Sequence, residues 1–194
     1  MYGYGETVTL LGFTPKWWHV QIREYTGFVP ADGLALEQRT GNYYDGYATA
    51  QVHNPISTDR LNLRVEKTEN SASLGKYYNG CTVAIVQKGN DGWSRVRIGN
   101  LEGYMKNQFL DFNAPKDQQT EMLPKVTIQN SNGQGVNLRK QASTHVNAVA
   151  LYPNGTQVQV LGIAGEWCHV LIDGEIGFMM TQYLVPRLSF ESTR

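Results

Sequence analysis

Two short stretches of the chain are near copies of each other: "DRLNLR" at residues 59–64 and "GVNLR" at residues 135–139. Their arginines, Arg64 and Arg139, stand 75 positions apart. Internal repetition, where it exists, determines the architecture of a whole chain. If this chain is built from copies of one unit, other features must recur at the same spacing.

The repetition continues through the rest of each unit. Two longer pairs of segments align: "YYNGCTVAIV" at 77–86 with "LYPNGTQVQVL" at 151–161, and "GYMKNQFL" at 103–110 with "GFMMTQYL" at 177–184. Between these segments Trp93 aligns with Trp167, after the loss of one residue in the preceding turn. Because turn glycines, apolar positions and tryptophans keep the same order, the similarity is not due to chance.

An earlier copy of the unit begins the chain, but it is incomplete. "GETVTLL" at 5–11 aligns with "GCTVAIV", Trp17 aligns with Trp93, and "TGFVPADGL" at 26–34 aligns with "EGYMKNQFL". Nothing in this copy corresponds to "NLR" or to the loop that follows it. An incomplete barrel leaves strand edges unpaired. Residues 37–50 folding back, packing on the second copy or a second chain could each complete residues 1–36, and we expect packing on the second copy, within a monomer.

Each unit is predicted to be all-β. Short segments such as "TVAIV" and "WSRVRI" are rich in β-branched residues, and "KGNDGW" carries an Asp-Gly turn, which is typical of a hairpin. A one-turn helix is expected at "NQF". Five or six short strands in about 60 residues favour a small barrel. An added strand is expected ahead of each complete unit, in "YATAQVHN" at 47–54 and "PKVTIQN" at 124–130.

These features predict the following organisation: a partial repeat at 1–36, a connection at 37–46, a repeat at 47–112, a linker at 113–121, a repeat at 122–187 and a tail at 188–194.

Composition excludes several classes of function. Lys and Arg together number 17, as do Asp and Glu, so the chain lacks the excess positive charge that drives binding to nucleic acid. The sequence has no apolar run of 18 or more residues, so no membrane span is predicted. The N-terminus has no signal-peptide pattern. An extracellular or wall-associated location is therefore expected only if the parent protein carries an export signal outside this chain.

The order of these motifs resembles the bacterial SH3 (SH3b) family, in the tandem form of Gram-positive cell-wall-associated proteins. The motifs are "LNLR", "NGCTVAIV", "GWSRVRI" and "GYMKNQFL", with their counterparts in the third copy. The resemblance covers the second and third copies and the back half of the first. It implies tandem small SH3-like β-barrels, the first one incomplete, that bind a wall peptide or glycan rather than catalyse a reaction.

The resemblance also implies an aromatic groove on each barrel, because aromatic side chains stack well on peptides and sugars. The predicted groove residues are Trp93, Tyr78 and Phe109 in the second repeat and Trp167, Tyr152 and Tyr183 in the third. Tyr78 and Tyr152 are included because we expect them in loops, where function is often carried. The alternative is that each tryptophan packs against its own barrel or a neighbour.

The arginines and cysteines of the repeats are expected to have structural rather than catalytic roles. Arg64 and Arg139 are expected to hold the irregular loop that follows them by a fixed fork of hydrogen bonds. Cys81 is expected at the surface. No metal, cofactor or catalytic site is predicted. His169 aligns with an arginine, which is not a metal ligand, and the sequence offers no long amphipathic helix for a nucleophilic cysteine to begin.

The sequence therefore predicts a non-catalytic binding module that anchors a protein at the bacterial cell wall. Two alternatives remain open. The repeats could form a protein–protein interaction scaffold, or the chain could be the targeting tail of a cell-wall hydrolase whose catalytic domain lies elsewhere.

Overall fold

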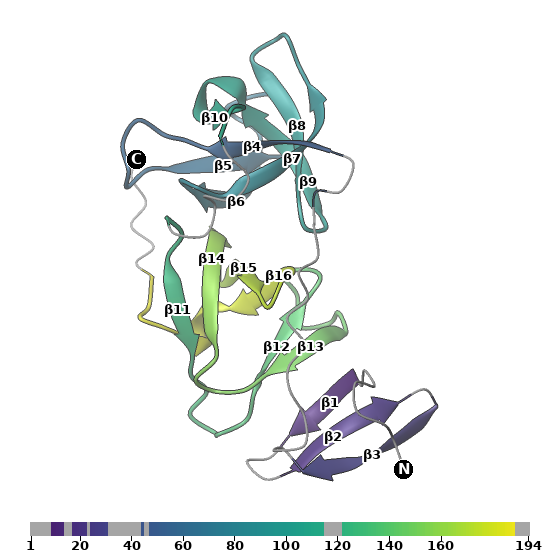
Figure 1. Cartoon of the computed structure of the whole chain (residues 1–194). Coiled ribbons are helices and arrows are strands. Elements are labelled where there is room, and N and C mark those ends of the chain that lie inside the picture. The colour runs from purple at the N-terminus through teal and green to yellow at the C-terminus, as the bar shows by residue number, and fades with distance from the viewer. Residues whose placement is uncertain are drawn as a thin grey trace.

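The computed structural model describes residues 9–13, 17–22, 24–30, 44, 47–114 and 122–188. It contains two stacked β-barrels and a separate three-stranded sheet, so the predicted all-β class is confirmed (Figure 1). Four predicted segments lie wholly or mostly outside the described residues: the start of "GETVTLL", the connection at 37–46, the linker at 113–121 and the tail at 188–194.

The second repeat forms a barrel of seven strands and a one-turn 3-10 helix. These elements are β4 (Ala48–Val52), β5 (Arg60–Arg64), β6 (Ser73–Tyr78), β7 (Thr82–Lys88), β8 (Trp93–Ile98), β9 (Leu101–Lys106), η2 (Asn107–Phe109) and β10 (Leu110–Asp111). Alternate residues of a strand face opposite sides, which places Leu61 and Leu63 of β5 in the core. Gly92 has a φ of 87° in the predicted Asp-Gly turn between β7 and β8.

The third repeat has the same topology. Its elements are β11 (Lys125–Ile128), β12 (Val136–Arg139), β13 (Ala148–Tyr152), β14 (Gln157–Ala164), β15 (Trp167–Ile172), β16 (Glu175–Met180), η4 (Thr181–Tyr183) and β17 (Leu184–Val185). The two added strands are confirmed: β4 pairs with β7 and β10, and β11 pairs with β14 and β17. The predicted helix at "NQF" is η2, and it recurs as η4.

The partial first repeat forms a sheet of β1 (Thr9–Phe13), β2 (Trp17–Ile22) and β3 (Tyr25–Pro30). Its register matches β7–β9 and β14–β16, down to the irregular step in the first strand of each hairpin. Strand β1 lies against β13, so this sheet neighbours the third repeat (Figure 1). Our expectation that it packs on the second repeat is wrong.

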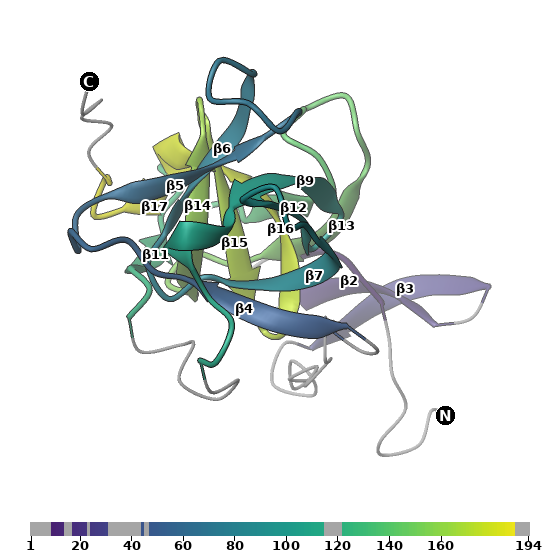
Figure 2. The same ribbon diagram turned by 90° about the horizontal axis from the view of Figure 1, so that it is seen from above.

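The two barrels are joined by a continuous sheet, because β6 pairs with β14 through Tyr77↔Gly162 and Lys76↔Ile163. Figure 2, which looks down the stack, shows the second barrel in front of the third and the first sheet to one side. A Cβ atom at Gly162 would lie 2.7 Å from the Lys76 carbonyl oxygen, so only glycine lets the strands approach this closely. The second repeat has Gln87 at the equivalent position. Among the described strands only β8 pairs with β7 there, so a side chain is accommodated.

His169 lies inside this junction and is 1% exposed. Its Nδ1 is hydrogen-bonded to the Tyr77 hydroxyl at 2.9 Å, and its ring stacks on Phe178 with centroids 4.2 Å apart. Its Nε2 has no hydrogen-bond partner within the described part of the chain. Burial lowers the pKa of His169 to about 3, so the imidazole is neutral in the folded protein.

Candidate ligand-binding groove

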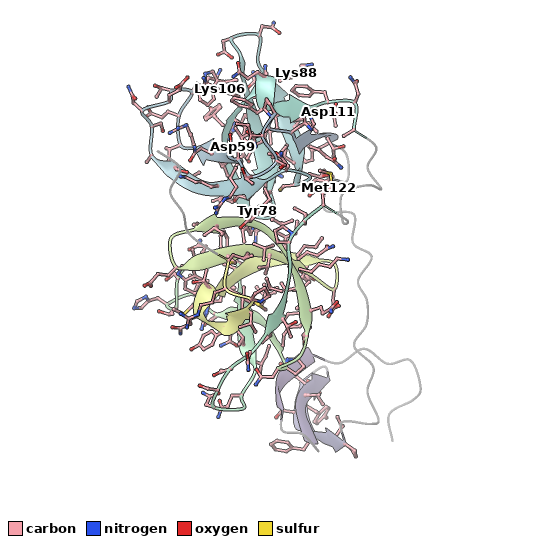
Figure 3. The ribbon with its side chains drawn as sticks, turned by 90° about the vertical axis from the view of Figure 1, so that its left-hand side faces the viewer. Asp59, Tyr78, Lys88, Lys106, Asp111 and Met122 are labelled. Carbon is pink, nitrogen blue, oxygen red and sulfur yellow. The ribbon has the colours of Figure 1, made fainter. Side chains whose placement is uncertain are left out.

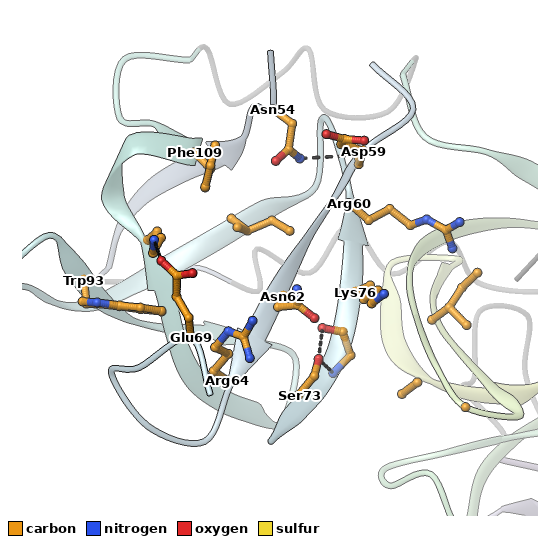
Figure 4. Close-up of a pocket in the computed structure, with 16 residues that line it drawn as sticks. Asn54, Asp59, Arg60, Asn62, Arg64, Glu69, Ser73, Lys76, Trp93 and Phe109 are labelled. Carbon is orange, nitrogen blue, oxygen red and sulfur yellow. Dashed lines mark hydrogen bonds and ion pairs between the residues drawn. The ribbon is translucent and has the colours of Figure 1, made fainter. Parts of the chain in front are cut away.

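A groove of about 590 Å³ crosses the second repeat (Figure 4). Its sides come from β5, β6, the loop between them, the start of β8 and helix η2, and the β14–β15 turn of the third repeat forms one end. The lining side chains include Asn54, Asp59, Arg60, Asn62, Arg64, Glu69, Ser73, Lys76, Trp93, Lys106 and Phe109. The groove therefore brings together two of the predicted aromatic residues, Trp93 and Phe109.

Strand alternation explains why β5 lines the groove. Its buried residues, Leu61 and Leu63, face the core, so Arg60, Asn62 and Arg64 face the other side. Arg64 Nη1 donates a hydrogen bond of 2.7 Å to the Ser71 carbonyl oxygen, seven residues along the chain.

The third repeat repeats this arrangement, because Arg139 donates to the Val146 carbonyl oxygen, again seven residues along. The predicted role of both arginines, holding the following loop, is confirmed. Each loop is thereby fixed as a wall beside the opening strand.

The loop and the tryptophan are bridged by an ion pair that the sequence did not reveal. Trp93 and Lys106 are cross-strand partners, and the Lys106 ammonium lies 5.7 Å from the centroid of the Trp93 ring. Lys106 also pairs with Glu69 of the loop, and this contact lowers the pKa of the Glu69 carboxyl. Met180 takes the place of Lys106 in the third repeat, so the two repeats present different surfaces.

Tyr78 lies outside the groove. It ends strand β6, packs against the cores of both barrels, and carries the Arg60 guanidinium 5.1 Å from its ring centroid. Figure 3 places Tyr78 at the boundary between the barrels. Our expectation that Tyr78 lies in a loop is wrong, and its structural role is to pack the junction.

The third repeat does not gather its predicted aromatics in the same way. Tyr152 is 6% exposed and lies in the core at the end of strand β13, so the predicted loop position is wrong. Its pairing with Val136 makes it the counterpart of buried Tyr77 rather than of Tyr78. Trp167 and Tyr183 are both half-buried, the first opposite Met180 and the second packed against the core.

No group of three or more His, Cys, Asp and Glu side chains arranged to hold a metal occurs among the residues that the structure describes. No helix there is long and apolar enough to cross a membrane. The expectation that Cys81 lies at the surface is wrong, because Cys81 and Cys168 are both buried. Residue 81 belongs to the turn that enters β7, whose first three residues are also buried.

Both thiols should be inert in the folded protein. Burial raises the pKa of Cys81 and raises that of Cys168 to about 12, and only the thiolate is reactive. We expect alkylation by iodoacetamide at pH 8 to be at least about 100-fold slower in the native protein than in denaturant. Mass spectrometry after timed quenching measures this, and rapid labelling of either native thiol would contradict the burial.

A family model described as "Bacterial SH3 domain" matches residues 59–111 and 134–185, which is more than half of the chain. The chain therefore belongs to the bacterial SH3 domain family, which confirms the resemblance noted in its sequence. One matched region lies in each barrel, and the added strands β4 and β11 lie outside the matches. Strands β1–β3 fall outside both matches, although their register is that of β7–β9 and β14–β16 inside them.

One curated relative is "Putative N-acetylmuramoyl-L-alanine amidase YrvJ" of Bacillus subtilis (strain 168), which is 22% identical over 179 residues. The alignment covers 87% of this chain and 34% of the relative, so the chain spans about a third of that protein's length. Among solved structures, NlpC2 and NlpC1 of Trichomonas vaginalis are 18% and 17% identical, each with a TM-score of 0.36. The matches cover 73% and 78% of this chain and 48% and 50% of those chains.

Proposed function

We propose that this chain is a non-catalytic module that binds bacterial cell-wall peptide through the groove of its second repeat. The observation that carries the proposal is that one groove combines two half-buried aromatic side chains with several charged ones. Trp93 and Phe109 supply apolar surface on which a peptide can lie. The loop held by Arg64 forms the facing wall, so the groove is preformed rather than assembled on binding.

The charges of the groove favour a peptide over a neutral glycan. Four cations and two carboxylates line it: Arg60, Arg64, Lys76 and Lys106 against Asp59 and Glu69. A net positive groove with both signs suits a short peptide that carries more carboxylates than amines. A ligand carboxylate at the Lys106 ammonium would compete with Glu69 for the same cation.

Sedimentation with purified bacterial sacculi tests the proposal. We expect Trp93→Ala to weaken binding about 30-fold, because truncating a central aromatic commonly costs about 2 kcal/mol. Lys140→Ala is the matched control, since it removes an exposed cation from the third repeat and should bind like the parent. Parent-like binding by a folded Trp93→Ala variant would exclude the groove, and no binding by the parent would exclude wall recognition altogether.

A second proposal is that this module targets a wall hydrolase. It is favoured by the alignment of most of this chain with about a third of an amidase. The chain would then hold a separate catalytic domain near its substrate and raise its effective concentration there. Fusing the chain to an unrelated wall hydrolase should increase the rate of lysis of sacculi, and the Trp93→Ala fusion should not.

A further inference from the structure

The groove of the second repeat ends on the third repeat (Figure 4). Three residues of the third repeat, Ile163, Ala164 and Gly165, belong to its lining. They lie at the end of strand β14 and in the turn to β15. One barrel therefore does not make the groove alone.

The main chain fixes this turn against strand β6. Lys76 is paired with Ile163. A Cβ atom at Gly75 would lie 3.3 Å from the Ile163 carbonyl oxygen and 3.5 Å from Ala164 Cβ. Close contacts between main chains do not depend on side-chain rotamers. This end of the groove is therefore preformed, like the wall made by the loop after Arg64.

The turn is one residue shorter than its counterpart in the second repeat, because "GIAGEW" at 162–167 replaces "QKGNDGW" at 87–93. Counted back from the tryptophan, Gly165 takes the place of Asp91. Gly165 has a φ of 59°, and a Cβ atom there would have no described neighbour within 4 Å. The groove is therefore open at this residue and meets no carboxylate there.

Two cations lie at the same end of the groove. Figure 4 shows Arg60 and Lys76 on the side of the third repeat, whereas Trp93 lies at the far side. Lys76 stands between two buried residues of β6, so its side chain faces the groove. Among the described residues no carboxylate forms an ion pair with Lys76.

This lysine belongs to the second repeat alone. Its cross-strand partner is Asn62. The equivalent pair in the third repeat is Asn137 with Leu151. The third repeat therefore lacks the cation at this position, although it has the same strands.

We propose that the second and third repeats form one composite binding site, in which a free carboxylate of the wall peptide lies at Lys76 beside Gly165. The inference rests on the proposed function, because it concerns the same groove, and it adds the ligand group and the role of the third repeat. That repeat closes the site of its neighbour instead of offering an equal second site. The lysine ammonium donates to the carboxylate, and such charge-assisted hydrogen bonds are stronger than those between neutral groups.

Sedimentation of the full chain with purified sacculi tests the site through two glycines. Gly165→Asp places a carboxylate at the turn and should bind sacculi at least about 10-fold more weakly, because like charges brought together are costly. Gly133→Asp is the matched control and should bind like the parent. It adds the same charge to the same repeat, at a glycine outside the groove that also has a positive φ and no described neighbour of its Cβ within 4 Å. Urea midpoints of the two variants separate lost binding from lost folding, since Asp adopts the same left-handed backbone in both.

Lys76→Gln tests the ligand carboxylate independently, because it changes no main-chain contact between the repeats. We expect it to weaken binding roughly 10-fold, the scale of a hydrogen bond to a charged group. The parent should lose a similar factor on sacculi whose carboxylates have been amidated with carbodiimide and ammonia, and Lys76→Gln should lose less by that treatment. Equal binding of the parent to amidated and untreated sacculi would show that no carboxylate is bound and would overturn the proposal.

The outcomes for the composite site and for the proposed function are distinct. Parent-like binding by a folded Gly165→Asp or by Lys76→Gln overturns the composite site, as does an equal loss in Gly165→Asp and Gly133→Asp. In each case a loss in Trp93→Ala would leave the proposed function standing. No binding by the parent would exclude wall recognition, and the composite site with it.

Discussion

Replacing Gly103 with valine is expected to lower the free energy of unfolding by about 3 kcal/mol. The atom that the new Cβ would meet is the Arg64 carbonyl oxygen, 2.6 Å away. A backbone atom cannot rotate aside as the end of a side chain can. Strand β5 must therefore move away from β9, and with it Leu63, which is fully buried in the core.

Gly27→Val is the matched control, because it makes the same change at the same register position, opposite a valine of the preceding strand. With nothing within 4 Å of its Cβ, the stability change should stay within about 0.5 kcal/mol. Urea unfolding followed by tryptophan fluorescence measures both variants. Equal losses at the two glycines would mean that glycine is needed for strand geometry alone, and the account of strand β5 would then be wrong.

The sequence predicted most of the fold because the deciding signals are local. The Asp-Gly turn before Trp93, the "LNLR" strand and the short helix at "NQF" each depend on a few adjacent residues. Repetition added a second, independent test of each element, since an assignment had to hold in both complete copies. The same alignment revealed the first sheet, whose register then proved to match the others.

Long-range pairing is what the sequence did not reveal. The residues before the Asn-Gly turn looked like an aromatic loop, yet β6 continues through Tyr78 because it pairs with β5 and, through Tyr77, with β14 of the next repeat. Tyr152 is buried for a related reason: its strand closes the third barrel. Both errors arose because the strands that pair with these residues lie elsewhere in the sequence: β12 of the same barrel for Tyr152, and β5 together with β14 of the next repeat for β6.

The sequence predicted only some of the residues that line the candidate groove, because it showed repeated motifs but not contacts between distant residues. Trp93 and Phe109 belong to repeated motifs, so alignment could find them. Glu69 and Lys106 are 37 positions apart and differ from their counterparts in the third repeat, so no motif joined them. The available signal was the difference between copies, because a surface position occupied by Lys106 in one repeat and by Met180 in the other gives the two repeats different surfaces.

Acid should destabilise the protein through His169. Its pKa lies near 6.5 in the unfolded chain and is lowered to about 3 by burial in the folded state. Between these values the unfolded state binds a proton that the folded state does not, so the free energy of unfolding falls as pH falls below 6.5. At pH 4.5 this one group should cost roughly 3 kcal/mol relative to pH 7.5.

The surroundings of the imidazole offer no compensation for a positive charge. Nδ1 meets the Tyr77 hydroxyl, the ring faces Phe178, and a Cβ atom placed on Gly99 of the β8–β9 turn would lie 3.4 Å from Nε2. None of these groups carries a negative charge at neutral pH. Burial is accordingly the cause of the lowered pKa, and the cost falls on the junction where the two barrels meet.

Urea unfolding of the parent and His169→Gln at pH 7.5 and pH 4.5 measures the effect. The variant can be less stable at both pH values, since it buries an amide, but its loss between them should be about 3 kcal/mol smaller than the parent's. His145→Gln removes an exposed histidine by the same substitution and is the control for it. Carboxylates and the remaining histidines contribute equally to the three proteins, so an identical pH dependence for the parent and His169→Gln would show that the junction histidine is not buried in neutral form.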